Sequence, residues 1–308
     1  MHAPRFAVET WISRLMHRPR CGLRAMIYTT LISTAALEAR LGDPQLVVVD
    51  CRHDLGKSDW GRAEYRRAHI PGARFLHLDD HLSARPNGAN GRHPLPDPAA
   101  FARTLGRAGI GSQTQVVAYD SQGGMVASRL WWMLRHWLGH EAAAVLDGGW
   151  DLWTAEGHAV SADVPHVHPV QFVAGSTADV VDARSVLEHL DRPGMILIDA
   201  RAPDRFRGEN ETLDPVGGRI PGARNRFFRD NLGKDGRFKP APMLREEFAA
   251  AIGGGRPDEV VHQCGSGVSA CHNVLAMDVA GLAGSRLYAG SWSEWCSDPS
   301  RPVERGVA

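Results

Sequence analysis

The sequence has no excess charge of either sign and no long apolar run. Its 308 residues include 35 Lys and Arg against 35 Asp and Glu, so the formal net charge is zero. Balanced charge gives no electrostatic reason to expect binding to nucleic acid or to an anionic membrane. No segment approaches the roughly 18 consecutive apolar residues of a membrane-spanning helix. We therefore expect a cytoplasmic protein whose partners include neither nucleic acid nor membrane.

Cysteine is scarce and odd in number. The five cysteines lack the close pairing of a disulfide framework, which fits a reducing compartment; they are at positions 21, 51, 264, 271 and 296. Two short patterns, Cys51-x-His53 and His166-x-His168, invite a metal interpretation. Neither has a second ligand pair at zinc-site spacing, so we expect loop or surface histidines there. We expect neither a metal nor a cofactor.

What the chain does contain is an internal repeat with a period of roughly 145 residues. Four pairs of segments recur in the same order: Val47–Asp50 and Ile196–Asp199, His69–Arg74 and Arg219–Arg224, Val116–Asp120 and Val260–Cys264, Leu146–Trp150 and Tyr288–Trp292. We predict two copies of one domain, at 26–158 and 178–308, joined by a linker at 159–177. Residues 1–25 are rich in arginine and poor in acids. We expect them to form a disordered leader, with a targeting segment as the alternative.

Each copy alternates short apolar strands with helical patterns such as Ala99–Ala108 and Val126–Leu138. This alternation predicts an α/β fold, in which each copy is a parallel sheet flanked by helices on both faces. Open sheets of this kind bind ligands at the carboxyl ends of their strands. Cys264 lies at such an end.

The loop that begins at Cys264 is the main candidate for chemistry. Between the strand and an apolar helix it holds five residues: Gly265, Ser266, Gly267, Val268 and Ser269. At a strand-to-helix junction, unpaired N–H groups and the positive end of the helix dipole stabilise an anion. The glycines let the loop aim several amides at one sulfur. We predict that Cys264 is a nucleophilic thiolate and that these loop residues bind substrate.

Two other interpretations of this loop fail on nearby residues. Gly265-x-Gly267-x-x-Ala270 matches a dinucleotide fingerprint, which requires an acidic residue about 20 positions further on. The segment Ser285–Gly290 contains none. A cysteine phosphatase loop needs an arginine where this chain has Ala270, so no guanidinium would hold a phosphoryl group.

The repeat provides an internal control for this prediction. The first copy has Asp120 where the second has Cys264. An aspartate suits a helix N-terminus electrostatically, but it cannot carry sulfur. We therefore expect the first copy to be catalytically silent.

From residue 26 onward the chain resembles the tandem-domain rhodanese family of sulfurtransferases. The resemblance rests on the paired Ile-Pro-Gly-Ala segments, Arg205–Gly208, Cys264–Ala270 and Gly290–Trp295. The loop is most similar to those of 3-mercaptopyruvate sulfurtransferases, whereas thiosulfate enzymes tend to carry basic residues after the cysteine. The resemblance implies sulfane-sulfur transfer from 3-mercaptopyruvate through a Cys264 persulfide. Thiosulfate as the donor, and a protein sulfur-relay module, are the alternatives.

The resemblance also implies roles for residues outside the loop. It implies that Ser266 assists the leaving enolate and is polarised by His93 and Asp79 from the first copy. It implies that Arg205 grips the donor carboxylate. A second arginine is usual a few residues later, but residues 209–215 contain none, which keeps thiosulfate in play.

The partners implied are a small-molecule sulfur donor and a sulfur acceptor. The acceptor is either a thiol, such as thioredoxin or glutathione, or cyanide. Cys271 follows Cys264 by about two helical turns, and we expect it to be a buried small side chain rather than a second reactive thiol.

Overall fold

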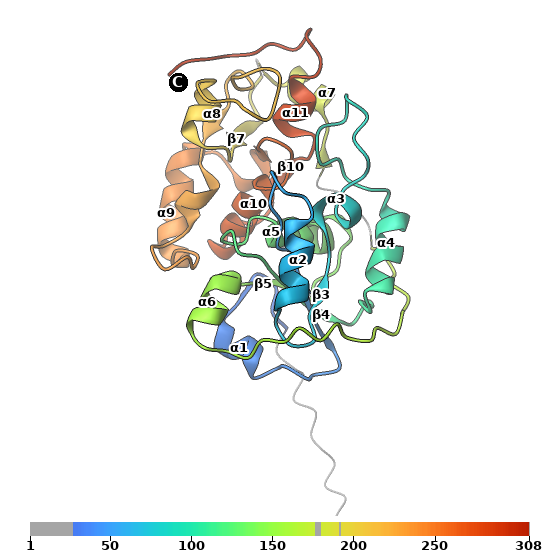
Figure 1. Cartoon of the computed structure of the whole chain (residues 1–308). Coiled ribbons are helices and arrows are strands. Elements are labelled where there is room, and N and C mark those ends of the chain that lie inside the picture. Colours follow the sequence, from blue (N-terminus) through green and yellow to red (C-terminus); the bar gives the residue numbers. More distant parts are fainter. Residues whose placement is uncertain (1–26, 176–179, 191, 308) are drawn as a thin grey trace, which may run out of the picture.

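The computed structural model describes residues 27–175, 180–190 and 192–307. The leader predicted at 1–25 lies outside the described residues. Each half of the chain contains a five-stranded sheet in which every pairing between strands is parallel, and helices flank each sheet (Figure 1). The predicted fold class is therefore confirmed. Within this part of the chain, no helix is long and apolar enough to cross a membrane.

The first half contains five strands and six α-helices among the described residues. Its elements are β1 (Leu31–Ile32), α1 (Thr34–Glu38), β2 (Leu46–Asp50), α2 (Trp60–Arg67), β3 (Arg74–Phe75), α3 (Leu78–His81), α4 (Pro98–Arg107), β4 (Gln115–Tyr119), α5 (Ala127–Trp132), a π-helical segment (Met133–Trp137), β5 (Ala143–Leu146) and α6 (Gly149–Ala155). The strand order is β1-β5-β4-β2-β3.

The second half repeats this arrangement. Its elements are β6 (Val180–Val181), α7 (Ala183–Glu188), β7 (Ile196–Asp199), α8 (Pro203–Arg207), β8 (Arg224–Asn225), a 3₁₀ turn (Phe228–Asn231), α9 (Ala241–Ile252), a second 3₁₀ turn (Pro257–Glu259), β9 (Val260–Gln263), α10 (Ala270–Val279), β10 (Arg286–Tyr288) and α11 (Ser291–Trp295). The strand order is β6-β10-β9-β7-β8, so both sheets share one topology.

Helices α5 and α10 pack against each other and join the two halves. All six residues of α5 and the first eight of α10 are buried. A helix that is buried on every side belongs to a core, and each large apolar side chain buried there contributes about 1.5–3 kcal/mol. Because each helix follows the loop at the end of a central strand, this contact brings the two loops toward one interface.

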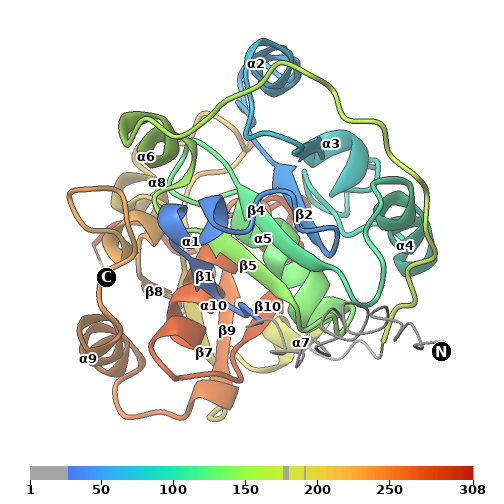
Figure 2. The ribbon, with the colours of Figure 1, turned by 90° about the horizontal axis from the view of Figure 1, so that it is seen from below.

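The connection between the halves runs along the outside of the first half, past α2 and α4 (Figure 2). Backbone hydrogen bonds fix it at three points. His69 and Ser161 form an isolated bridge, Val170 donates to the Gly106 carbonyl, and Gly175 donates to that of Leu138. At Gly106 a Cβ would lie 2.3 Å from the Val170 carbonyl oxygen, so the close approach of this segment to α4 requires glycine there.

Candidate active site

Cys264 follows β9, a fully buried strand near the middle of the second sheet, and is itself 2% exposed. The backbone N–H of Gly267 donates to Sγ over 3.2 Å. Gly267 has a φ of +75°, and a Cβ there would lie 2.2 Å from the Ala289 carbonyl oxygen. Only glycine therefore lets the loop turn back onto the sulfur.

Ser291, at the start of α11, supports the loop from the other side. Its hydroxyl accepts a hydrogen bond from the backbone N–H of Cys264 at 3.1 Å and donates to the Tyr288 carbonyl at 2.9 Å. It is the one residue other than glycine with a positive φ, +54°, in the described ranges. Such a conformation persists where the surrounding structure enforces it. No sequence pattern indicated this role.

The equivalent loop of the first half, which begins at Asp120, binds a carboxylate through backbone amides. The Asp120 carboxylate is fully buried and accepts four backbone N–H groups at 2.7–2.9 Å, those of Gln122, Gly124, Val126 and Ala127. Burial raises the pKa of Asp120, and these hydrogen bonds oppose the rise. At the same offsets from Cys264, the second loop has Ser266, Val268, Ala270 and Cys271. In the first half, this position is therefore surrounded by amides suited to an anion, and in the second half the amide of Gly267 donates to the sulfur.

A hydrogen-bonded chain crosses from the first half to this loop. His93 Nδ1 lies 2.7 Å from Ser266 Oγ, and His93 Nε2 lies 3.2 Å from Asp79 Oδ1. We assign the imidazole proton to Nε2, because Asp79 accepts it there; Nδ1 then accepts the serine hydroxyl proton. Burial lowers the pKa of His93 despite the opposing carboxylate, and the hydrogen bond from His93 lowers the pKa of Asp79.

Arg129 of α5 forms hydrogen bonds to both segments that contribute to this hydrogen-bonded series. Its fully buried guanidinium donates to the Gly267 carbonyl and to the His93 carbonyl, both over 3.0 Å. Burial lowers the pKa of Arg129, an effect that negative charge on Cys271 or Cys264 opposes. One cation thus holds the nucleophile loop and the histidine segment at a fixed separation.

Two further arginines face Gly265. A Cβ built there would lie 2.9 Å from Arg92 Nη2 and 3.5 Å from Arg205 Nη1. Arg205, which the resemblance implicated in donor binding, comes from α8. Arg92 comes from the first half and was missed, although it directly precedes His93. The second cation therefore comes from the other domain rather than from the segment after Arg205.

That segment supplies carboxylates instead. Glu211 accepts two hydrogen bonds from Nη2 of Arg205 at 2.8 Å and one from Nε at 3.1 Å. Asp214 pairs with Arg205 at 3.4 Å and also with Arg92. Burial works against ionisation of Glu211, but the hydrogen bonds from Arg205 and nearby amides outweigh it and lower its pKa. These two acids hold both guanidinium groups beside the loop.

The other described cysteines are buried, free thiols. Cys271 donates to the Gly267 carbonyl, and burial raises the pKa of its thiol to about 12. Burial also raises the pKa of Cys296 to about 11 and that of Cys51 well above its usual range. Cys271 is thus buried on α10, where the sequence expectation put it.

His53, His77 and Asp79 bring possible metal-ligand atoms within 4.8 Å of one another. Both ring nitrogens of His77 are engaged, since Nδ1 accepts two backbone N–H groups and Nε2 lies 2.8 Å from the Ser58 carbonyl. Asp79 is paired with His93. Hydrogen bonds therefore hold His77 and Asp79, whereas Nδ1 of His53 is buried without a partner. His53 lies in the loop after β2 and is buried, with 2% of its surface exposed, whereas His166 and His168 are exposed on the linker.

Comparison with known proteins identifies the family. The rhodanese-like domain family matches residues 33–156 and 182–298. A probable 3-mercaptopyruvate sulfurtransferase of Pseudomonas aeruginosa is 47% identical over 90% of this chain and 98% of its own. Mouse thiosulfate sulfurtransferase is 34% identical over 92% of this chain and 96% of its own. The crystal structure of SseA from Escherichia coli, described as a 3-mercaptopyruvate sulfotransferase, superposes with a TM-score of 0.75 at 30% identity, over 86% of this chain and 99% of its own.

The chain belongs to the rhodanese-like family, as its motifs predicted. Its relatives are sulfurtransferases, so it is an enzyme of that class, with a sulfur donor and a sulfur acceptor.

Proposed function

We propose that this enzyme takes sulfur from 3-mercaptopyruvate, holds it as a persulfide on Cys264, and passes it to a thiol or to cyanide. The observation that carries the proposal is the chain from Ser266 through His93 to Asp79 beside the sulfur. Proton transfer is needed when the leaving group is a carbon anion, and these residues can perform it. The 47% identical relative from Pseudomonas aeruginosa supports the same donor.

The first half-reaction balances without any external oxidant. The Cys264 thiolate attacks the donor sulfur, an S–S bond forms, and the C–S bond breaks with its electron pair going to carbon. The donor's thiol proton passes to His93 through the Ser266 hydroxyl and returns to the enolate carbon, giving pyruvate. Asp79 stabilises the imidazolium while it holds that proton. The persulfide is left as an anion among the loop amides.

In the second half-reaction the acceptor attacks the outer sulfur. A thiolate leaves as a persulfide, or cyanide leaves as thiocyanate, and Cys264 returns to its thiolate. The two half-reactions give ping-pong kinetics. Arg92 and Arg205 are suited to holding the donor carboxylate, because planar guanidinium groups bind it in a fixed orientation.

Thiosulfate is the second candidate donor, and the two arginines favour it. A compact dianion gains from cations beside the thiol, and both guanidinium groups face Gly265. Its leaving group, sulfite, needs no proton, so the serine–histidine chain would be idle. The mouse relative at 34% identity bears the name of this activity.

The two donors can be separated by measuring kcat/KM for both in the wild-type enzyme and in Ser266→Ala. We expect mercaptopyruvate to be preferred by the wild type. The substitution should lower kcat/KM for mercaptopyruvate by about 100-fold or more and change that for thiosulfate less than about threefold. A wild-type preference for thiosulfate would decide for the second candidate. A protein relay would turn over neither donor.

A further inference from the structure

A strongly basic pocket lies in the first half, away from the Cys264 loop. It has a volume of about 530 Å³ and is bounded by α2, β3, the end of α4 and the linker. Four arginines line it: Arg62, Arg66, Arg74 and Arg107. None of its lining residues is acidic, although basic and acidic residues are equally numerous in the chain as a whole. Positive charge is therefore concentrated at a concave site, where it attracts anions most strongly.

The arginines of this pocket are incompletely neutralised. Within the described ranges, only Arg62 forms an ion pair, with Asp80 at 2.8 Å, where both side chains are partly exposed. Arg74 donates through Nη1 to the Gly72 carbonyl, but its Nε is shielded from solvent and has no hydrogen-bond partner. A buried donor without a partner is unfavourable, so the Arg74 guanidinium is not fully satisfied by the protein itself.

The second half shows a different use of the same position. Arg224 matches Arg74 in the repeated segments, and its Nη1 donates to the Ala251 carbonyl near the end of α9 at 2.8 Å. In the first half, the linker lies beside the end of α4 and its Val164, Pro165 and Val167 form an apolar wall. The pocket thus combines several cations with an apolar surface.

We propose that this pocket binds a small organic polyanion, a molecule with two or more phosphate or carboxylate groups on an apolar body. Arginine forks match both kinds of oxyanion, and the volume suits a ligand of ordinary metabolite size. The apolar wall of the linker would pack against the uncharged part. The pocket is connected to the Ser266–His93–Asp79 site through α3, because His81 lines the pocket and Asp79 belongs to the same helix.

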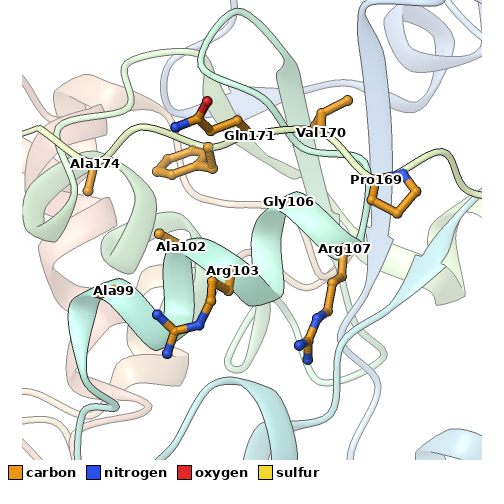
Figure 3. Close-up of a pocket in the computed structure, with 10 residues that line it drawn as sticks. Ala99, Ala102, Arg103, Gly106, Arg107, Pro169, Val170, Gln171 and Ala174 are labelled. Carbon is orange, nitrogen blue, oxygen red and sulfur yellow. The ribbon is translucent and has the colours of Figure 1, made fainter.

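Arg103 and Arg107 provide a matched pair for testing this site. They are one turn apart on α4 and extend from it side by side, with linker residues Pro169–Ala174 running alongside the helix (Figure 3). Both are exposed, so neither substitution should disturb folding. Both arginines line the neighbouring, largely apolar pocket of about 650 Å³ beneath the linker, but Arg107 also lines the basic pocket and Arg103 does not.

The test is isothermal titration calorimetry at low ionic strength with ATP and pyrophosphate as phosphate probes, citrate as the carboxylate probe, and sulfate as the single-oxyanion reference. We expect at least one polyanion to bind at least tenfold more tightly than sulfate. The probe that binds identifies which oxyanion the site takes. Arg107→Gln and Arg66→Gln should each weaken that binding by about fivefold or more, and Arg103→Gln by less than twofold.

Three outcomes would overturn the proposal. The first is that no polyanion binds more tightly than sulfate. The second is an equal loss in Arg103→Gln and Arg107→Gln, which would indicate nonspecific charge. The third is binding that disappears in Arg205→Gln but survives in Arg107→Gln, which would locate the polyanion beside Cys264 instead.

Discussion

His93 Nδ1 and Ser266 Oγ lie 2.7 Å apart, although 173 positions separate the two residues in the chain. The histidine belongs to the first half and the serine to the nucleophile loop of the second. Their contact completes the chain to Asp79, and Arg129 fixes the spacing by binding a carbonyl on each side. The proposed active site is therefore assembled between the two copies of the domain.

Replacing the nucleophile should stop the reaction at its first step. Cys264→Ser should abolish turnover and also the mass increase of roughly 32 Da, one sulfur atom, that intact protein shows after incubation with donor. Cys271→Ser is the matched control. Because the Cys271 thiol is buried and its pKa is raised to about 12, that variant should keep the mass increase and most of the rate. Turnover by Cys264→Ser would refute the mechanism.

The Asp120 loop should matter for stability and little for chemistry. Asp120→Ala leaves four buried N–H groups without their acceptor, so we expect the free energy of unfolding to fall by roughly 1–3 kcal/mol or more. Calorimetry measures this loss, and kcat should change less than about threefold. A fall in kcat above about 100-fold with the fold intact, roughly 2.7 kcal/mol of barrier, would show that the first loop takes part directly.

The acids behind the arginines should affect donor binding. Asp214→Asn removes the charge shared by Arg92 and Arg205, so both guanidinium groups lose a fixed position. We expect KM for the donor to rise about tenfold while kcat falls less than about threefold, measured by steady-state kinetics. Glu209→Gln is the control, because Glu209 pairs with Arg207 at a more exposed position. An equal effect of both substitutions would contradict positioning by Asp214.

Two buried histidines predict a loss of stability in acid. Burial lowers the pKa of His262 to about 3 and that of His272 to about 4. Both remain neutral in the folded protein at pH 5, whereas in the unfolded chain, with a pKa near 6.5, they bind protons. The free energy of unfolding should therefore be highest above about pH 6.5 and fall as the pH drops toward 4.

Chemical denaturation at pH 7 and pH 5 measures this slope. His272→Gln should reduce the difference in the free energy of unfolding between pH 7 and pH 5 by about 2 kcal/mol, since a glutamine takes up no proton on unfolding. His166→Gln, on the exposed linker, should leave the slope unchanged. A slope identical in His272→Gln and the wild type would show that His272 is not the group responsible.

Local sequence patterns were sufficient to predict the repeat, the parallel sheets and the Cys264 loop. Those features depend on strand periodicity and on a glycine-rich turn, which neighbouring residues encode. Arg92 was not predicted, because its place beside Gly265 depends on how the two halves pack. The loop comparison that favoured 3-mercaptopyruvate was incomplete for the same reason, since it considered only residues that follow Cys264 in the sequence. The buried position of His53 likewise follows from tertiary packing that no short pattern records.

The interface between α5 and α10 also has a genetic consequence. A duplicated domain can be redundant, but here the two copies contribute different residues to one site. The second copy contributes Cys264 and Ser266, and the first contributes His93 and Asp79. A damaging substitution in either half should therefore affect the same proposed catalytic centre. Two inactive chains, one altered at His93 and the other at Cys264, could complement each other only by exchanging whole domains.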